Sequence, residues 1–168
     1  MTVSSSPRAI LSLPTDEEIL VTREFAAPRH LVFEAWTTPE LVERWWHANR
    51  GRVTLVEIDL RVGGKWRYVM VADDGMEVGF HGEYLEIVPG ERLVTSEVYE
   101  GLPDGVSTEM GGTTNTLTLT DTGSGGTLAT LLIKATSKDS RDAIIASGME
   151  LGLQDALDLL EATAQSLG

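Results

Sequence analysis

The sequence predicts an α+β fold with a curved antiparallel sheet of about seven strands, two short helices and one long C-terminal helix. Three patterns lead to this prediction. Apolar side chains alternate with polar ones over residues 18–25, recur at helical spacing over 28–46, and alternate again over 52–135. Residues 139–166 then have one apolar stripe at helical spacing, suited to covering one face of the sheet. This arrangement is a helix-grip fold.

The strands are expected to follow one another directly in the sheet. The first, Glu18–Phe25, ends at Ala27-Pro28 because proline has no amide proton to donate to a strand ladder. Six further strands are expected after Arg52, and the segments that separate them are rich in turn-forming residues and short, apart from a long loop expected from Gly101 to Gly112. Short turns between consecutive strands predict an antiparallel meander. Examples are Gly63-Gly64 and Pro89-Gly90.

The chain is expected to form one domain. Its 168 residues match the usual size of a single domain, and no linker or internal repeat interrupts the pattern. Residues 1–16 are rich in Ser, Pro and Thr, which predicts a mobile N-terminal tail. The helix-grip domain is therefore assigned to residues 17–168.

Composition and charge exclude several classes of function. Thirteen basic and 26 acidic residues give an acidic protein with a net charge of −13, which disfavours binding to nucleic acid or to anionic membranes. The chain has no cysteine, and His30, His47 and His81 match no metal-ligand spacing, so no metal and no cofactor are expected. No segment approaches the ~20 apolar residues of a membrane helix, and the first 20 residues lack a signal-peptide core. A cytoplasmic location is expected.

Several strings occur in the order typical of one protein family, between about residues 18 and 165. They are Phe25-Ala-Ala-Pro28, Leu31-Val-Phe-Glu-Ala-Trp-Thr-Thr-Pro-Glu-Leu41, Arg44-Trp-Trp46, Asp59-Leu-Arg-Val-Gly-Gly64-Lys-Trp66, Gly82-Glu-Tyr-Leu-Glu-Ile87, Glu91-Arg-Leu-Val94 and Gly148-Met-Glu-Leu-Gly152. In these strings the chain resembles the START-like (SRPBCC, birch-pollen-allergen-like) superfamily. The resemblance is to its bacterial branch, related to the C-terminal domain of the activator of heat-shock protein ninety ATPase.

The resemblance implies a helix-grip domain with an internal cavity, and two positions depart from the family pattern. Such sequences usually continue with Gly-Pro after Arg44-Trp-Trp46, whereas this chain has His47-Ala-Asn-Arg-Gly51. Many relatives have a tryptophan after Gly152, where this chain has Leu153, which indicates a changed or larger cavity.

The cavity is expected between the last helix and the concave face of the sheet. Its lining follows from the apolar parity of the strands and from the helix stripe. One of the adjacent Trp45 and Trp46 should pack in the core and the other should face the cavity entrance or solvent, because helical neighbours point about 100° apart. The expected lining comprises some of Val56, Ile58, Trp66, Tyr68, Met70, Tyr84, Leu131, Met149, Leu153 and Leu157.

Polar residues of the strands decide whether the cavity has chemistry beyond binding. An inward Glu97 would have a raised pKa and could serve as a general base, whereas an outward Glu97 would have no such role. We favour the outward orientation for Glu97 and a surface position for His81, although an inward His81 could orient a ligand carbonyl. Tyr84 completes the set of acid–base candidates.

Three functions follow from these observations. The first is a binding domain for a small apolar or amphipathic molecule, and the second is a cavity enzyme of cyclase, aromatase or hydrolase type that uses Glu97, His81 or Tyr84. The third is a stress-related, co-chaperone-like interaction protein. Eukaryotic co-chaperones pair this domain with a separate N-terminal domain, for which these 168 residues leave no room. Open sheet edges further suggest a homodimer.

Overall fold

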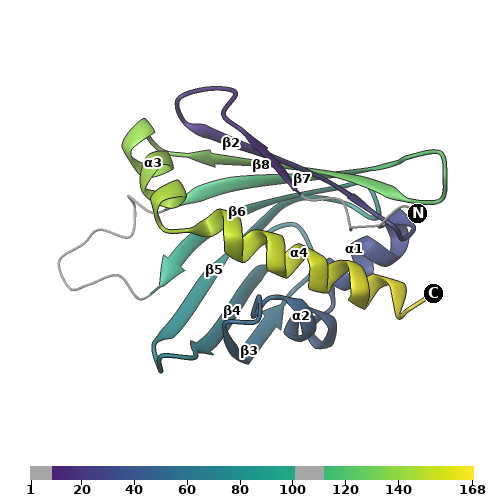
Figure 1. Cartoon of the computed structure of the whole chain (residues 1–168), viewed down its shortest axis with the longest axis horizontal. Coiled ribbons are helices and arrows are strands. Elements are labelled where there is room, and N and C mark those ends of the chain that lie inside the picture. Colours follow the sequence, from purple (N-terminus) through teal and green to yellow (C-terminus); the bar gives the residue numbers. More distant parts are fainter. Residues whose placement is uncertain (1–8, 101–111) are drawn as a thin grey trace, which may run out of the picture.

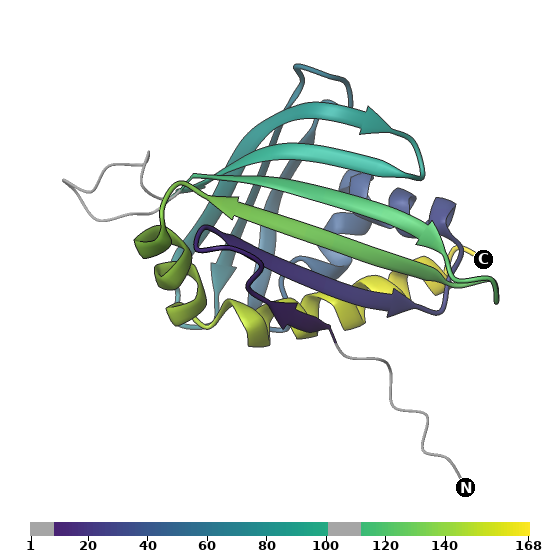
Figure 2. The ribbon, with the colours of Figure 1, turned by 90° about the horizontal axis from the view of Figure 1, so that it is seen from above.

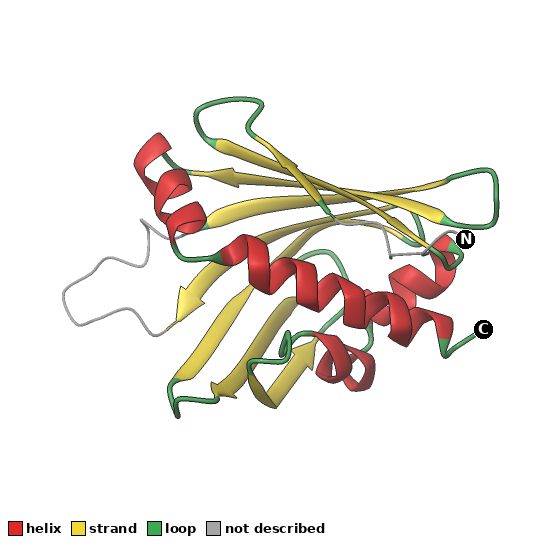
Figure 3. Ribbon diagram, viewed as in Figure 1, coloured by secondary structure: helices red, strands yellow, loops and turns green. Residues whose placement is uncertain are grey.

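The computed structural model describes residues 9–100 and 112–168. Within them the chain forms one antiparallel sheet of eight strands, crossed on its concave face by a long helix (Figures 1 and 3). The predicted α+β helix-grip fold is confirmed. The strands are β1 (Ile10–Ser12), β2 (Glu18–Phe25), β3 (Gly51–Ile58), β4 (Lys65–Ala72), β5 (Glu77–Val88), β6 (Arg92–Glu100), β7 (Thr113–Asp121) and β8 (Thr127–Ala135). The helices are α1 (Arg29–Thr37), α2 (Pro39–Trp45), α3 (Lys138–Ala146) and α4 (Met149–Gln165).

The strand order is β1-β2-β8-β7-β6-β5-β4-β3. Strands β3 to β8 form the predicted meander, and β2 pairs with β8 along its whole length, from Glu18 opposite Lys134 to Phe25 opposite Thr127. The eighth strand, β1, lies within the segment predicted as a mobile tail of residues 1–16. It pairs with β2 through Leu11 opposite Val21. Three residues are too few to give an alternation signal, and residues 1–8 of that segment lie outside the described residues. Residues 101–111 of the loop expected from Gly101 to Gly112 also lie outside the described residues.

The sheet curves around the helix, as Figure 2 shows from above. Register shifts mark the bends, one between Val53 and Leu55 against β4 and one between Tyr84 and Glu86 against β6. Strands β5 and β6 approach closely at Gly82, where an added Cβ would collide with the carbonyl oxygen of Ser96. Edge strands β1 and β3 remain open to pairing among the described residues, and the homodimer stays a prediction.

The C-terminal segment forms two helices where the sequence predicted one over residues 139–166. Helix α3 ends at Ala146, and α4 begins after Gly148, whose φ of 85° is a left-handed conformation that glycine adopts without steric cost. The break turns α3 away from the axis of α4. Ile145 on α3 is 37% exposed, although residues 139–166 were expected to share one buried apolar stripe.

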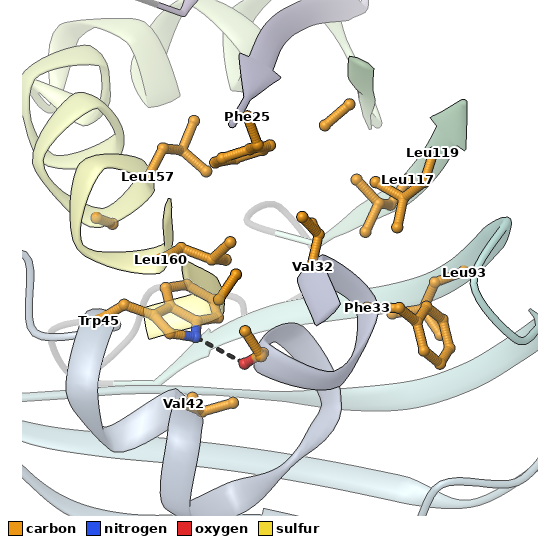
Figure 4. Packing of buried hydrophobic residues seen from close by; sticks show 14 of the residues in the cluster. Phe25, Val32, Phe33, Val42, Trp45, Leu93, Leu117, Leu119, Leu157 and Leu160 are labelled. Atoms are coloured by element: carbon orange, nitrogen blue, oxygen red, sulfur yellow. Dashed lines mark hydrogen bonds between the residues drawn. The ribbon is translucent and has the colours of Figure 1, made fainter. Parts of the chain in front are cut away.

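The core lies where the C-terminal half of α4 packs against α1 and α2 (Figure 4). Leu160 is completely buried, and Leu157 packs toward Phe25. Trp45 is also buried, and its indole Nε1 donates to the carbonyl oxygen of Ala35 at 2.9 Å, which joins the two short helices. This polar atom is thus satisfied inside an otherwise apolar cluster.

Polar contacts tie the same face of α4 to the N-terminal strands. The Arg23 side chain is 1% exposed and contacts Asp158 at 2.8 Å and Glu161 at 3.3 Å. Glu161 also accepts from the Ala26 amide at 2.8 Å, and Gln154 exchanges two hydrogen bonds with the backbone of Ala9. A buried guanidinium without its carboxylates would be costly, so this contact set fixes the position of α4 along β2.

Truncation of Leu160 to alanine should lower the free energy of unfolding by about 2–5 kcal/mol, the usual range for a large-to-small change in a packed core. Leu160 is chosen because its side chain is fully buried between α4 and the short helices. Urea denaturation of Leu160→Ala beside the wild type measures the difference. A loss below about 1 kcal/mol would show that this face of α4 does not form the core.

Candidate functional site

A cavity of about 870 Å³ lies between the concave face of the sheet and the two C-terminal helices. Strands β4 to β8 form its floor and sides, α3 and the N-terminal half of α4 form its roof, and the turn after α2 contributes its remaining border. Most of the lining is apolar. The sequence-predicted residues that line it are Trp45, Trp46, Trp66, Tyr68, Met70, Tyr84, Glu97, Leu131, Met149 and Leu153.

The N-terminal half of α4 borders the open volume. Met149, Gly152 and Leu153 face the open volume, and a Cβ added to Gly152 would meet no atom within 4 Å. The C-terminal half of the same helix carries Leu160 and Ala164, both fully buried. One helix therefore closes the core with one half and roofs a cavity with the other.

Aromatic side chains gather on one wall of the cavity. Trp46 meets Tyr68 and Phe80 edge-on, with ring centroids 5.5 Å and 5.9 Å apart. Phe80 also contacts Tyr99 at 5.1 Å. The opposite wall is aliphatic, formed by Leu117, Leu131, Ile133, Ile144 and Leu153.

The two adjacent tryptophans have different environments. Trp45 is 6% exposed and belongs to the core, although its edge reaches the cavity lining. Trp46 is half-buried and packs on the aromatic wall. Its indole therefore sits where a bound molecule would change its surroundings.

Glu97 faces the cavity, which corrects our expectation of an outward side chain. Leu93, Thr95 and Tyr99 share its parity on β6 and also line the cavity. The Asn115 amide nitrogen donates to Glu97 Oε2 across the β6–β7 pairing. Thr113 in turn donates to Asn115 Oδ1 at 2.9 Å, so three polar side chains form one chain of hydrogen bonds on an apolar surface.

The surroundings of Glu97 favour its neutral form. Burial raises the pKa of the Glu97 carboxyl, and the Asn115 hydrogen bond opposes this shift only in part. No cation forms an ion pair with Glu97 in the part of the chain that the structure describes. The protonated carboxyl can then donate a hydrogen bond as well as accept one.

Two tyrosine hydroxyls lie next to this group. Those of Tyr68 and Tyr84 are hydrogen-bonded to each other, and burial raises the pKa of both phenols. The nearby Tyr84 and the charge of Glu97 raise the pKa of Tyr68 further. Both phenols therefore stay neutral at physiological pH, so the cavity offers neutral hydrogen-bonding groups.

His81 lies on the outer face of the sheet, as we expected, and does not line the cavity. Its Nδ1 is 2.7 Å from Glu100 Oε2, and Arg67 pairs with the same carboxylate at 2.8 Å. The hydrogen bond from Arg67 is the main cause of the lowered pKa of Glu100. Phe80 and Tyr84 point inward, and His81 has the opposite parity on β5.

Three further predicted residues do not line the cavity. Val56 and Ile58 belong to edge strand β3, whose inner face packs against α2, and both contact the apolar core. Leu157 is 3% exposed and points toward Phe25 rather than into the open volume. Each is apolar with the expected parity, so sequence pattern alone could not separate core from cavity lining.

Sequence reasoning missed other lining residues. Phe80 and Tyr99 share parity with Tyr84 and Glu97, so fixing the phase of those two strands would have found them. His47 and Arg50 come from the turn that departs from the family pattern, and Arg50 pairs with Asp155 on α4 at 2.7 Å. His47 Nδ1 accepts from the Asn49 amide, which leaves Nε2 to donate to the Arg44 carbonyl oxygen.

Neither a metal site nor a membrane-spanning helix occurs in residues 9–100 and 112–168. Among them, no group of three histidines or carboxylates is placed to hold a metal ion. No helix in these ranges is both long enough and apolar enough to cross a membrane.

The fold and the cavity define a helix-grip domain of the START-like superfamily. The family model described as "Activator of Hsp90 ATPase homolog 1-like protein" matches residues 26–165. The chain belongs to this family. The resemblance deduced from its sequence strings is thereby confirmed, and no curated protein matches the chain.

Solved structures share the fold over nearly the whole chain. A protein of Rhodobacter sphaeroides is 26% identical, with a TM-score of 0.83 over 95% of this chain and 99% of the other. A Mycobacterium smegmatis protein is 24% identical, with a TM-score of 0.81 over 93% and 96%. A Chromobacterium violaceum protein is 28% identical, with a TM-score of 0.75 over 89% and 98%.

Replacing Glu97 by glutamine should stabilise the protein more as pH rises. Below the ordinary glutamate pKa the carboxyl is protonated in both the folded and unfolded chains, so its burial costs little. As pH passes from that value through the raised pKa, ionisation penalises the folded wild type but not Glu97→Gln. Urea denaturation between about pH 4 and pH 8 should show the stability difference growing in favour of the variant.

Glu100→Gln on the same strand is the matched control. The pKa of Glu100 is lowered, so its charge stabilises the folded chain above the ordinary glutamate pKa, and that contribution is lost as pH falls. Glu100→Gln should therefore be less stable than the wild type by an amount that stays constant above the ordinary glutamate pKa and shrinks only as pH falls below it. A flat difference for Glu97→Gln across this window would contradict a buried carboxyl at position 97.

Gly152→Ala should raise the free energy of unfolding by about 0.5–1 kcal/mol, because alanine is a better helix former and the added methyl meets no neighbour. Thermal and urea denaturation measure the gain. A loss of stability would mean that α4 lies closer to the sheet and that the cavity is smaller.

Proposed function

We propose that the chain binds a small, neutral molecule, apolar or amphipathic, in the cavity beneath α4. The main observation that supports this proposal is the cavity of about 870 Å³ with its largely apolar lining. Binding sites for small molecules commonly have about 300–1,000 Å³ and combine apolar walls with a few polar groups. An interior filled by side chains would instead favour an interaction protein.

The charges around the cavity support a neutral ligand. Burying an unpaired charge is costly, and the lining offers an anion little compensation. Arg50 already pairs with Asp155, and the acidic side chains Glu97 and Asp139 lie on the same surface. The net charge of −13 further disfavours the approach of anions.

Titration with N-phenyl-1-naphthylamine, a neutral fluorescent apolar probe, tests the proposal. We expect saturable probe fluorescence and a matching change in tryptophan emission, since Trp46 packs on the cavity wall. Leu153→Trp should weaken binding at least roughly tenfold, because the indole would occupy the volume that the ligand needs.

Leu151→Trp is the matched control, since it adds the same indole two residues away on a side chain that is 64% exposed. It should bind the probe as the wild type does. Absence of saturable binding, or equal loss in both variants, would overturn the cavity as the binding site.

A further inference from the structure

We propose that the ligand is a neutral aromatic carbonyl compound and that the Glu97 carboxylic acid donates a hydrogen bond to its carbonyl oxygen. This inference rests on the proposed function and names the chemistry of its ligand. It depends on the Thr113–Asn115–Glu97 hydrogen-bond chain and on the position of this chain beside the aromatic wall.

The hydrogen-bond chain determines which oxygen of Glu97 remains available. The Thr113 hydroxyl donates to Asn115 Oδ1 at 2.9 Å, so the Asn115 amide presents its nitrogen to Glu97. Glu97 Oε2 is therefore an acceptor. In the protonated acid the hydrogen then resides on Oε1, and no protein group within the described ranges accepts it.

The cavity contains nothing that would keep this carboxyl ionised. Asn115 is its one hydrogen-bond partner among residues 9–100 and 112–168, and burial raises its pKa. Across the cavity, the two cationic candidates are engaged elsewhere, Arg50 with Asp155 and His47 with the backbone of its own turn. The titratable side chains that line the cavity with Glu97 are Tyr68, Tyr84, Tyr99, Asp139, His47 and Arg50.

The walls select the shape of the ligand. Trp46, Phe80 and Tyr99 form a continuous series of ring contacts, and aliphatic side chains face them across the cavity. A flat ring system fits between such surfaces with good contact on both sides. Because Glu97 and Tyr99 lie on the same strand with the same parity, a ring against this wall brings its carbonyl substituent near the acid.

The experiment compares two probes of nearly equal shape, 2-acetylnaphthalene and 2-isopropylnaphthalene, by displacement of N-phenyl-1-naphthylamine. One hydrogen bond should make the ketone bind about 5- to 10-fold tighter than the hydrocarbon. Glu97→Leu should abolish this preference, Glu97→Gln should retain much of it through its amide hydrogen, and Glu100→Gln on the outer face should leave it unchanged.

The pH dependence of ketone binding by the wild type provides a second test. Ionisation converts Glu97 into an acceptor, so wild-type affinity for the ketone should fall as pH rises through the pKa of this carboxyl. The same titration of Glu97→Gln should lack that fall, which separates Glu97 from His47 and Asp139 on the lining. The carbonyl stretch of ¹³C-labelled 2-acetylnaphthalene should move to lower frequency when bound to the wild type and not to Glu97→Leu.

The outcomes separate the two proposals. If both probes bind with equal affinity and Leu153→Trp blocks both, the hydrogen-bond inference is overturned and the cavity-binding function stands. If neither probe displaces the dye from a site sensitive to Leu153→Trp, the aromatic-carbonyl inference fails and cavity binding of the dye stands. If the dye itself shows no binding that is sensitive to Leu153→Trp, both proposals fail. A ketone preference that survives in Glu97→Leu would assign the donor to another group and overturn the role of Glu97.

Discussion

Helix α4 is fastened to the rest of the molecule along its C-terminal half, and the remaining architecture depends on this uneven attachment. Leu160 and Ala164 are fully buried against the short helices, and Arg23 joins β2 to Asp158 and Glu161. Salt bridges contribute little by themselves when exposed, but Arg23 is enclosed and stacks over the Phe25 ring at 5.1 Å. The apolar contacts bind α4 to the short helices, and the ion pairs fix its position along β2.

The first half of the helix borders the cavity, whereas the second half is buried. Gly148 reverses the chain before α4, so α3 can cover the end of the open volume instead of continuing along the sheet. Gly152 adds no side chain at the roof, where its Cβ position is empty. A straight helix with larger residues at these positions would bring more side chains into the cavity. The cavity is thus a consequence of helix geometry as much as of strand curvature.

Much of this architecture could be predicted from the sequence, because alternation is clear in the first half of β4 and along β7 and the order of elements allows few topologies. The predictions were wrong where one sequence pattern is compatible with two structures. Both faces of β6 contain polar and apolar residues, so the sequence of this strand does not show which face points inward. Pairing with β5 and β7 places Glu97 on the inward face. Val56 and Leu157 fit the pattern of lining residues, but Val56 packs against the apolar core and Leu157 points toward Phe25. The break at Gly148 was missed because the apolar stripe continues through it in sequence.

Glu97 is a side chain whose position on the cavity wall lowers the stability of the folded chain. A carboxyl on an apolar wall costs more than a leucine there would, even with Asn115 as partner, since desolvation raises its pKa despite that hydrogen bond. Thr113 and Asn115 orient the Glu97 carboxyl through their hydrogen bonds. Farther along β7 the side chains on the same face are apolar and buried, namely Leu117 and Leu119. An oriented, neutral donor within an apolar cavity has little value for folding. In the function that we propose, its value lies in discriminating among ligands, because an apolar analogue would leave the donor unpaired while a carbonyl oxygen would satisfy it.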